Sequence, residues 1–275
     1  MLFANPNAVR QPYPEALREI MSIAKAGQSR DWLAHWSGLN RGATPLYDLP
    51  DLAAELGVGQ LLVKDESQRS SLGSFKALGA PIALVRLILR RFPEHNFNVA
   101  ALLRGEHAEA LAGFTVISAT DGNHGRALAA AAQSLGCRCV IVLHANVSVE
   151  REPAIAAYGA KIVRISGNYD ESVEEAAALA YRNGWLVVSD TSYDGYEEIP
   201  RDVMQGYGTI AAEIVEAHEQ RFTHVFLQGG VGGLAAGIAS YLWELHGEQR
   251  PTFVVVEPVQ ALSLIHISEP TRQEA

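Results

Sequence analysis

Short apolar runs alternate with helical patterns from residue 115 onward. The predicted strands are continuous apolar runs bounded by turn residues, at residues 115–119, 138–143, 161–165, 185–189, 225–228 and 253–256. The predicted helices lie between them, at residues 123–135, 149–158, 171–181, 199–219 and 234–245. Strands that are hydrophobic throughout are typical of parallel sheets covered on both faces. The pattern predicts an α/β fold, with parallel sheets and helices on both faces.

The first part of the chain is less regular. A strand-like run at residues 61–63 precedes a helical stretch that Ser74-Phe75-Lys76 opens, and the apolar run within this stretch contains Arg86. That stretch is too short to span a bilayer. Residues 91–113 contain Pro93 and Gly105, and we interpret them as a surface excursion. Since no repeat or low-complexity linker occurs, a second domain is expected as an insertion.

Composition narrows the class of protein. With 275 residues, 48% of them hydrophobic, the chain can form one large domain or two modest ones. A net charge of -9 gives no basic face, which excludes a nucleic-acid partner. The amino terminus lacks a signal-peptide pattern, so we expect a cytoplasmic protein without a membrane partner. Cys137 and Cys139 are expected to be small buried side chains in a reducing compartment.

Polar segments follow several predicted strands. They are residues 64–67, 120–123, 190–193 and 228–230. In open parallel sheets, ligands bind beyond the carboxyl ends of the strands. The segments are therefore expected to converge on one edge.

A glycine-rich turn at residues 229–233 joins a predicted strand to a predicted helix. Successive backbone N–H groups in such a turn, together with the helix dipole, can bind a phosphate without a basic side chain. A tight structural turn is the alternative. The order Gly-Gly-Val-Gly-Gly does not match the G-x-G-x-x-G dinucleotide pattern.

Lys76 follows Ser74-Phe75 and precedes the small residues Ala77, Gly79 and Ala80. Although most lysines are solvated surface charges, packing here would disfavour the ammonium form and leave an amine for Schiff-base chemistry. A lysine at one helix start and a glycine nest at another together indicate pyridoxal 5'-phosphate (PLP).

Four motifs occur in an order that resembles the fold-type II, tryptophan-synthase-β-like PLP enzymes. They are Lys64-Asp65-Glu66-Ser67, Ser74-Phe75-Lys76, Thr120-Asp121-Gly122-Asn123-His124-Gly125 and the turn at residues 229–233. Within that superfamily, Asp121, residues 190–200 and residues 204–207 resemble the diaminopropionate ammonia-lyases. The resemblance covers residues 43–261. It implies a large PLP domain formed by residues 1–114 and 190–261, with a smaller α/β domain inserted at residues 115–189.

The resemblance also implies roles for individual residues. Lys76 would hold PLP as a Schiff base, and Asn123 would hydrogen-bond the ring hydroxyl oxygen. The phosphate would be bound by Gly229, Gly230, Val231, Gly232 and Gly233. The expected catalytic residues are Lys76, Asp121 and Asp190, and the expected substrate contacts are Thr120, Asp121 and Asp190.

Asp121 stands where relatives with other substrates usually have Ser or Thr facing the substrate carboxylate. A carboxylate there would be repulsive, so Asp121 is expected to transfer a proton at Cα or to contact a substrate cation. Capping of a helix or turn is the alternative for both Asp121 and Asp190.

The implied activity is α,β-elimination of 2,3-diaminopropionate to pyruvate and two ammonia, by a homodimer acting on a small amino-acid substrate. Lys76 and Asp121 on opposite faces would allow the L and also the D enantiomer to react. A threonine or serine dehydratase, a β-replacement enzyme and a non-catalytic PLP-binding module are the alternatives. The histidines lack H-E-x-x-H spacing and the serines lack a G-x-S-x-G elbow, so we expect neither a catalytic metal nor a serine hydrolase. His124 is expected to pack or hydrogen-bond.

The last residues break the family pattern. Residues 262–272 resemble the translation of a sequencing adapter, so residues 262–275 are expected to be a non-native tail. We therefore expect a chain truncated at its C-terminal end near Ala261, without the group that pairs with the pyridine nitrogen. Such a chain would fold poorly or be inactive, and the activity above would belong to the intact protein.

Overall fold

The computed structural model describes residues 3–120 and 122–258. Their helices are α1 Glu15–Arg18, α2 Ile23–Leu33, α3 Pro50–Leu56, α4 Lys76–Arg91, α5 Val99–Leu103, α6 Ala108–Leu111, α7 Asn123–Leu135, α8 Arg151–Ala156, α9 Tyr169–Asn183, α10 Glu198–Ala217 and α11 Gly233–His246. The strands are β1 Leu46–Asp48, β2 Leu62–Lys64, β3 Thr115–Ala119, β4 Arg138–Leu143, β5 Lys161–Arg164, β6 Leu186–Val187, β7 His224–Gln228 and β8 Thr252–Val256. Asp121 and the predicted tail lie outside the described residues.

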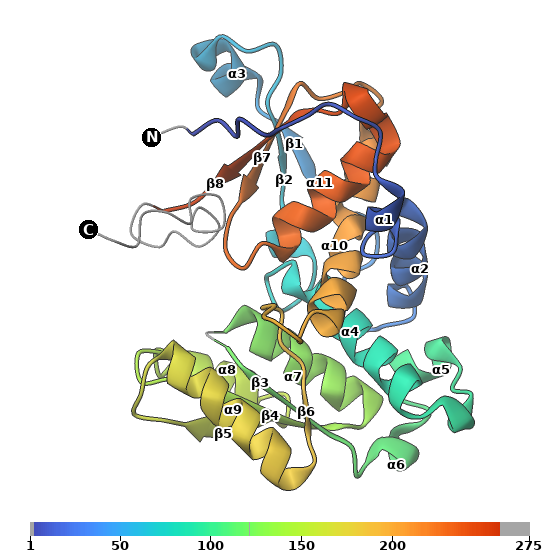
Figure 1. The fold of residues 1–275 in the computed structure, drawn as a ribbon, viewed down its shortest axis with the longest axis vertical. Helices are drawn as coiled ribbons and strands as arrows, with labels where there is room; N and C mark the ends of the chain where they lie inside the picture. The colour runs from blue at the N-terminus through green and yellow to red at the C-terminus, as the bar shows by residue number, and fades with distance from the viewer. Residues whose placement is uncertain (1–2, 121, 259–275) are drawn as a thin grey trace.

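A four-stranded parallel sheet in the order β5-β4-β3-β6 forms the lower part of the molecule in Figure 1. Its side chains alternate between two clusters. Ile117 and Val140 pack with Ala176 of α9, whereas Val116 and Ile141 belong to the cluster that contains α7. All five residues of β3 are buried, which explains the continuous apolar run in the sequence. The predicted parallel sheet with helices on both faces is confirmed here.

The remaining strands form two small sheets in the upper part of Figure 1. β7 and β8 are parallel and lie beside α11, and Val225 pairs with Phe253. β1 and β2 are antiparallel, with Tyr47 opposite Val63, an arrangement that strand-helix alternation did not predict. The predicted domain boundaries remain a prediction.

Residues 91–113 do not form a surface excursion, so that prediction was wrong. The segment contains α5 and α6, and Leu102, Leu103 and Leu111 are 0–1% exposed. These side chains belong to the main core together with α4 and α7. Short helices of four or five residues show too little periodicity to be recognised in a sequence.

Helices α4 and α10 cross with their backbones in direct contact. A Cβ atom on Gly206 would lie 2.0 Å from the carbonyl oxygen of Leu78, and one on Gly79 would lie 2.7 Å from Val203 Cγ1. Only glycine fits at these positions. The close crossing fixes the start of α4, where Lys76 lies.

A buried ion network joins the β1–β2 pair to α10. Glu213 is 3% exposed and accepts hydrogen bonds from Lys64 Nζ at 2.6 Å and from Arg69 NH1 and NH2 at 2.6 and 2.7 Å. Arg69 also donates to Glu66, at 2.8 and 2.9 Å. Burial would raise the pKa of Glu213, but hydrogen bonds from Arg69 and Lys64 hold the pKa below its ordinary value. Lys64 and Glu66, which the sequence placed among the ligand segments, therefore serve this network.

The two cysteines are free thiols. Cys139 is buried in β4 and Cys137 is partly buried just before it. Burial raises the pKa of each thiol to about 12, so both are inert in the folded protein.

Replacement of Glu213 tests the buried network. Glu213→Gln leaves Lys64 and Arg69 buried without their shared carboxylate, and it should lower the free energy of unfolding by about 3 to 5 kcal/mol. Denaturant titration measures this change. The control is Glu216→Gln on the same helix, where the carboxylate is 58% exposed and pairs with Arg30, and it should cost less than about 1 kcal/mol. Equal effects of the two variants would contradict a structural role for the network.

Candidate active site

A cavity lies between the segment that enters α10 and the start of α11. Its volume is about 720 Å³. Its lining includes Asp190, Asp194, Glu197, Arg201, Val231, Gly232 and Gly233. The predicted substrate residue Asp190 and part of the predicted phosphate turn are thus brought together at one cavity.

Lys76 is the first residue of α4, and its Nζ atom donates a hydrogen bond to Asp190 Oδ2. The Lys76 side chain is 18% exposed and that of Asp190 is 13% exposed. The ammonium also lies 5.3 Å from the ring centre of Phe75 and 5.8 Å from that of Tyr207. Lys76 is therefore a mostly desolvated amine that does not itself line the cavity but contacts Asp190, which does.

Asp190 follows β6 and remains ionised although it is buried. Burial would raise its pKa, but electrostatic interactions with His124 and Lys76 and the hydrogen bond from Lys76 lower the pKa to about 2. The neighbouring backbone is anchored by Tyr196, whose hydroxyl accepts from Ser189 N at 2.8 Å and donates to Val187 O at 3.1 Å. This tether was not predicted, because it joins residues across an irregular segment.

The glycine turn ends in an uncapped helix. Gly232 is the N-cap of α11 with φ +89°, and as a glycine it provides no side-chain cap for the first backbone N–H groups of this helix. A Cβ atom on Gly230 would meet no other atom within 4 Å, so the space beside the turn is open. An uncapped N-terminus of a 14-residue helix at a cavity is suited to an anion.

The asparagine loop leads into α7. Asn123 is exposed at the first residue of the helix, and Thr120 is buried, with its Oγ1 3.4 Å from the N–H of Gly122. Asp121 lies between them, outside the described residues. His124 is 3% exposed, and its Nδ1 lies 3.9 Å from Asp190 Oδ2, so the start of α7 reaches the Lys76–Asp190 pair.

Three polar atoms near this pair are buried and have no hydrogen-bond partner among the described residues. They are His124 Nδ1, Thr191 Oγ1 and Tyr207 Oη. Burial raises the pKa of Tyr207 well above its ordinary value. Unpaired buried polar atoms are rare in folded proteins, and they gather at sites that bind ligands or perform chemistry. Tyr207 belongs to the segment at residues 204–207 that carries the family resemblance, but the sequence assigned it no role at the site.

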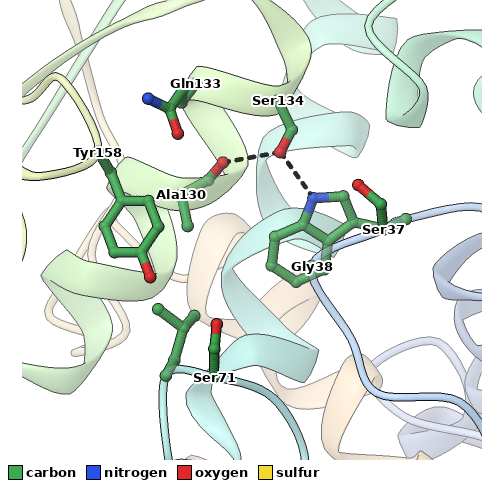
Figure 2. A pocket seen from close by; sticks show the side chains of 9 residues that line it. Ser37, Gly38, Ser71, Ala130, Gln133, Ser134 and Tyr158 are labelled. Carbon is green, nitrogen blue, oxygen red and sulfur yellow. Dashed lines mark hydrogen bonds between the residues drawn. The ribbon is translucent and has the colours of Figure 1, made fainter.

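A second, much smaller cavity of about 80 Å³ lies beside α7 and is shown in Figure 2. The indole N–H of Trp36 donates to Ser134 Oγ at 3.0 Å, and this hydroxyl donates to Ala130 O at 3.0 Å. The predicted site residues do not line this cavity. Some of its polar groups already form hydrogen bonds with one another, so we assign no catalytic or binding role to this cavity.

Residues 3–120 and 122–258 contain neither a metal-binding cluster nor a membrane-spanning helix. No group of three or more His, Cys, Asp and Glu side chains there is arranged to hold a metal ion. No helix in the same residues has the length and apolar character needed to cross a membrane.

Comparison with known proteins agrees with the geometry. The chain is 38% identical over 228 residues to the diaminopropionate ammonia-lyase of Salmonella typhimurium, which covers 81% of this chain and 56% of the relative. It is 40% identical over 223 residues to that of Escherichia coli K12, covering 79% and 55%. The chain thus spans about half the length of the curated relatives it matches.

A crystal structure of the Escherichia coli enzyme, in complex with an aminoacrylate-PLP azomethine reaction intermediate, superposes with a TM-score of 0.85. It is 35% identical, and the match covers 97% of this chain and 66% of that one. The model of the family described as pyridoxal-phosphate dependent enzymes matches residues 38–274. This chain therefore belongs to the family of pyridoxal-phosphate-dependent enzymes.

Proposed function

We propose that the protein converts 2,3-diaminopropionate to pyruvate and two ammonia, with PLP as its cofactor. The observation that carries the proposal is the contact of the Lys76 amine with the Asp190 carboxylate at a cavity that the glycine turn also lines. The similarity to two diaminopropionate ammonia-lyases supports the choice of substrate.

The residues present fit the cofactor. The uncapped start of α11 and the open space beside Gly230 suit the phosphate, and the desolvated Lys76 amine suits the aldehyde. We assign Asn123 to the ring hydroxyl oxygen on the basis of the sequence motif. PLP, when bound, supplies an electron-withdrawing pyridine ring that stabilises negative charge at Cα.

The side chains at the cavity have separate tasks in this proposal. Lys76, once neutral, takes the proton from Cα and returns a proton to the departing Cβ amine. Asp190 orients the Lys76 amine and attracts a positively charged substrate. Asp194 and Glu197 also line the cavity, although Glu197 already pairs with Arg201. The electrostatic attraction to these carboxylates is stronger for a substrate with an amino group at Cβ than for one with a hydroxyl group there.

Asp121 is proposed as a second base, on the face of Cα opposite Lys76, and Thr120 as a substrate contact. Both assignments rest on the motif Thr120-Asp121-Gly122-Asn123. The sequence resemblance further supports a homodimer and a cytoplasmic location, and both stay predictions.

The substrate assay separates the proposed lyase from its alternatives. Incubation with L- and D-2,3-diaminopropionate should yield pyruvate with two ammonia per molecule, and threonine should yield little 2-oxobutyrate. Lys76→Ala should lower kcat/KM by on the order of 10² to 10⁴, since it removes the base. The control is Lys161→Ala, at an exposed position at the start of β5, and it should retain full activity. Keto acid from threonine alone would favour a dehydratase, and bound PLP without turnover would favour a binding module.

The glycine turn is tested in the apo protein and in the loaded protein. Gly230→Ala adds a methyl group into open space, so the unfolding midpoint of the apo protein should not change. The methyl group would stand in the proposed phosphate position, and the Kd for PLP should rise about ten-fold or more because a charged hydrogen bond is weakened. Gly59→Ala, which also meets open space, is the control and should leave the Kd unchanged. An unaltered Kd in Gly230→Ala would remove this turn from the phosphate site.

Asp121→Asn tests the assignment of two bases. An amide cannot accept the Cα proton, so activity should fall by roughly 10² or more for one enantiomer and stay near the wild-type level for the other. Separate kinetic assays with L- and D-diaminopropionate measure this difference. Equal activity with both enantiomers would exclude Asp121 as a base.

A further inference from the structure

The imidazole of His124 is enclosed between Val188 and Asp190. Its side chain is 2% exposed, and its Nε2 lies 2.9 Å from the carbonyl oxygen of Val188. A carbonyl oxygen can only accept a hydrogen bond, so Nε2 must carry a hydrogen. The open question at this residue is therefore the state of Nδ1.

Nδ1 has no hydrogen-bond partner among the described residues and faces Asp190 Oδ2 at 3.9 Å. Without a hydrogen, Nδ1 would direct a lone pair at a carboxylate, and two buried acceptors would oppose each other. With a hydrogen, the ring is an imidazolium beside a carboxylate, and a shift of about 1 Å brings the pair to hydrogen-bond distance. The charge and the geometry both favour the second state.

Asp190 needs this second cation because its contact with Lys76 cannot be permanent. Lys76 must lose its proton before its nitrogen can act as a base or a nucleophile, and a neutral amine no longer balances the carboxylate. A buried carboxylate without a cation is strongly unfavourable. His124 Nδ1 and Lys76 Nζ both face Oδ2 of Asp190. His124 can therefore balance the negative charge of Asp190 while Lys76 is neutral.

We propose that His124 is a positioning residue, which carries a hydrogen on both ring nitrogens, donates from Nδ1 to Asp190, and keeps this carboxylate ionised when Lys76 is neutral. The group of three then carries a net charge of +1 with Lys76 protonated and 0 with Lys76 neutral. It never becomes negative, which suits a cavity whose other wall is the proposed phosphate turn. The part played by neutral Lys76 rests on the proposed function, whereas the pairing of His124 with Asp190 does not.

The first test observes the unsubstituted protein, and a substitution serves only to assign the resonances. Nitrogen-15 NMR of the apo protein with labelled histidine at neutral pH distinguishes protonated from bare ring nitrogens. The resonances of His124 are assigned by their loss in His124→Gln. Two protonated nitrogens are expected, and a bare Nδ1 would overturn the proposal.

The second test is a double-mutant cycle on unfolding of the apo protein. His124→Gln keeps a side-chain N–H for Val188 but has no group in place of Nδ1, and Asp190→Asn removes the charge. The pair should be coupled by roughly ten-fold in the unfolding equilibrium constant. The coupling should grow in a Lys76→Met background, because His124 is then the remaining cation beside Asp190. A histidine that only packs would give additive effects in both backgrounds, and that result would overturn the proposal.

If His124→Gln does not fold, His124→Asn replaces it in the cycle, since its amide can stand near the Nδ1 position and donate to Asp190. Under the proposal, His124→Asn retains part of the coupling, and complete loss of coupling would contradict it. All these measurements use the apo protein. A coupled His124–Asp190 pair without diaminopropionate turnover would therefore refute the proposed function alone, and turnover with an additive cycle would refute the role of His124 alone.

Discussion

The close crossing of α4 and α10 is the contact on which the geometry of the candidate active site depends. Gly206 lets the α10 backbone lie against the Leu78 carbonyl oxygen of α4, and Gly79 leaves room on α4 for the side chains of Val203 and Tyr207. A similar contact lies between α10 and α11, where a Cβ atom on Gly237 would be 2.9 Å from the Met204 carbonyl oxygen. Three helices are thereby fixed to one another. Lys76 at the start of α4, Asp190 before α10 and the glycine turn before α11 are positioned by this packing.

Two buried carboxylates in the structure show how the same kind of group serves different purposes. Glu213 is 3% exposed and lies between Lys64 and Arg69, which both donate hydrogen bonds to it and do not line the cavity. No step of the proposed reaction requires Lys64 or Arg69 to lose its hydrogen bond to Glu213. The network therefore holds the β1–β2 pair on α10 permanently. Asp190 instead lies at the cavity wall, with one cation in contact and another at 3.9 Å. A carboxylate with an exchangeable partner is suited to chemistry, and one with permanent partners is suited to stability.

Much of the fold could be predicted from the sequence where elements are long and regular. The observed bounds of β3, α7 and β4 are those that the apolar pattern predicts, since each is buried on at least one whole face. The apolar pattern did not predict several of the short helices and strands. The pattern predicts a surface segment where α5 and α6 lie and no strand at β1, because three to five residues carry almost no periodic signal. Tertiary contacts rather than local preference stabilise such elements.

The sequence by itself determined the α/β class, the family resemblance and the residue types of the site, because apolar periodicity and motifs are local properties. Lys76, Asp190 and the glycine turn were all recognisable in this way. Only the tertiary structure decided that Lys76 meets Asp190 and that Lys64 belongs to a buried network away from the cavity. It also gave His124 a neighbour 66 residues away along the chain. The physical reason is that pairing between distant side chains depends on how helices cross, and the positions of those crossings are set by the packing of the whole core.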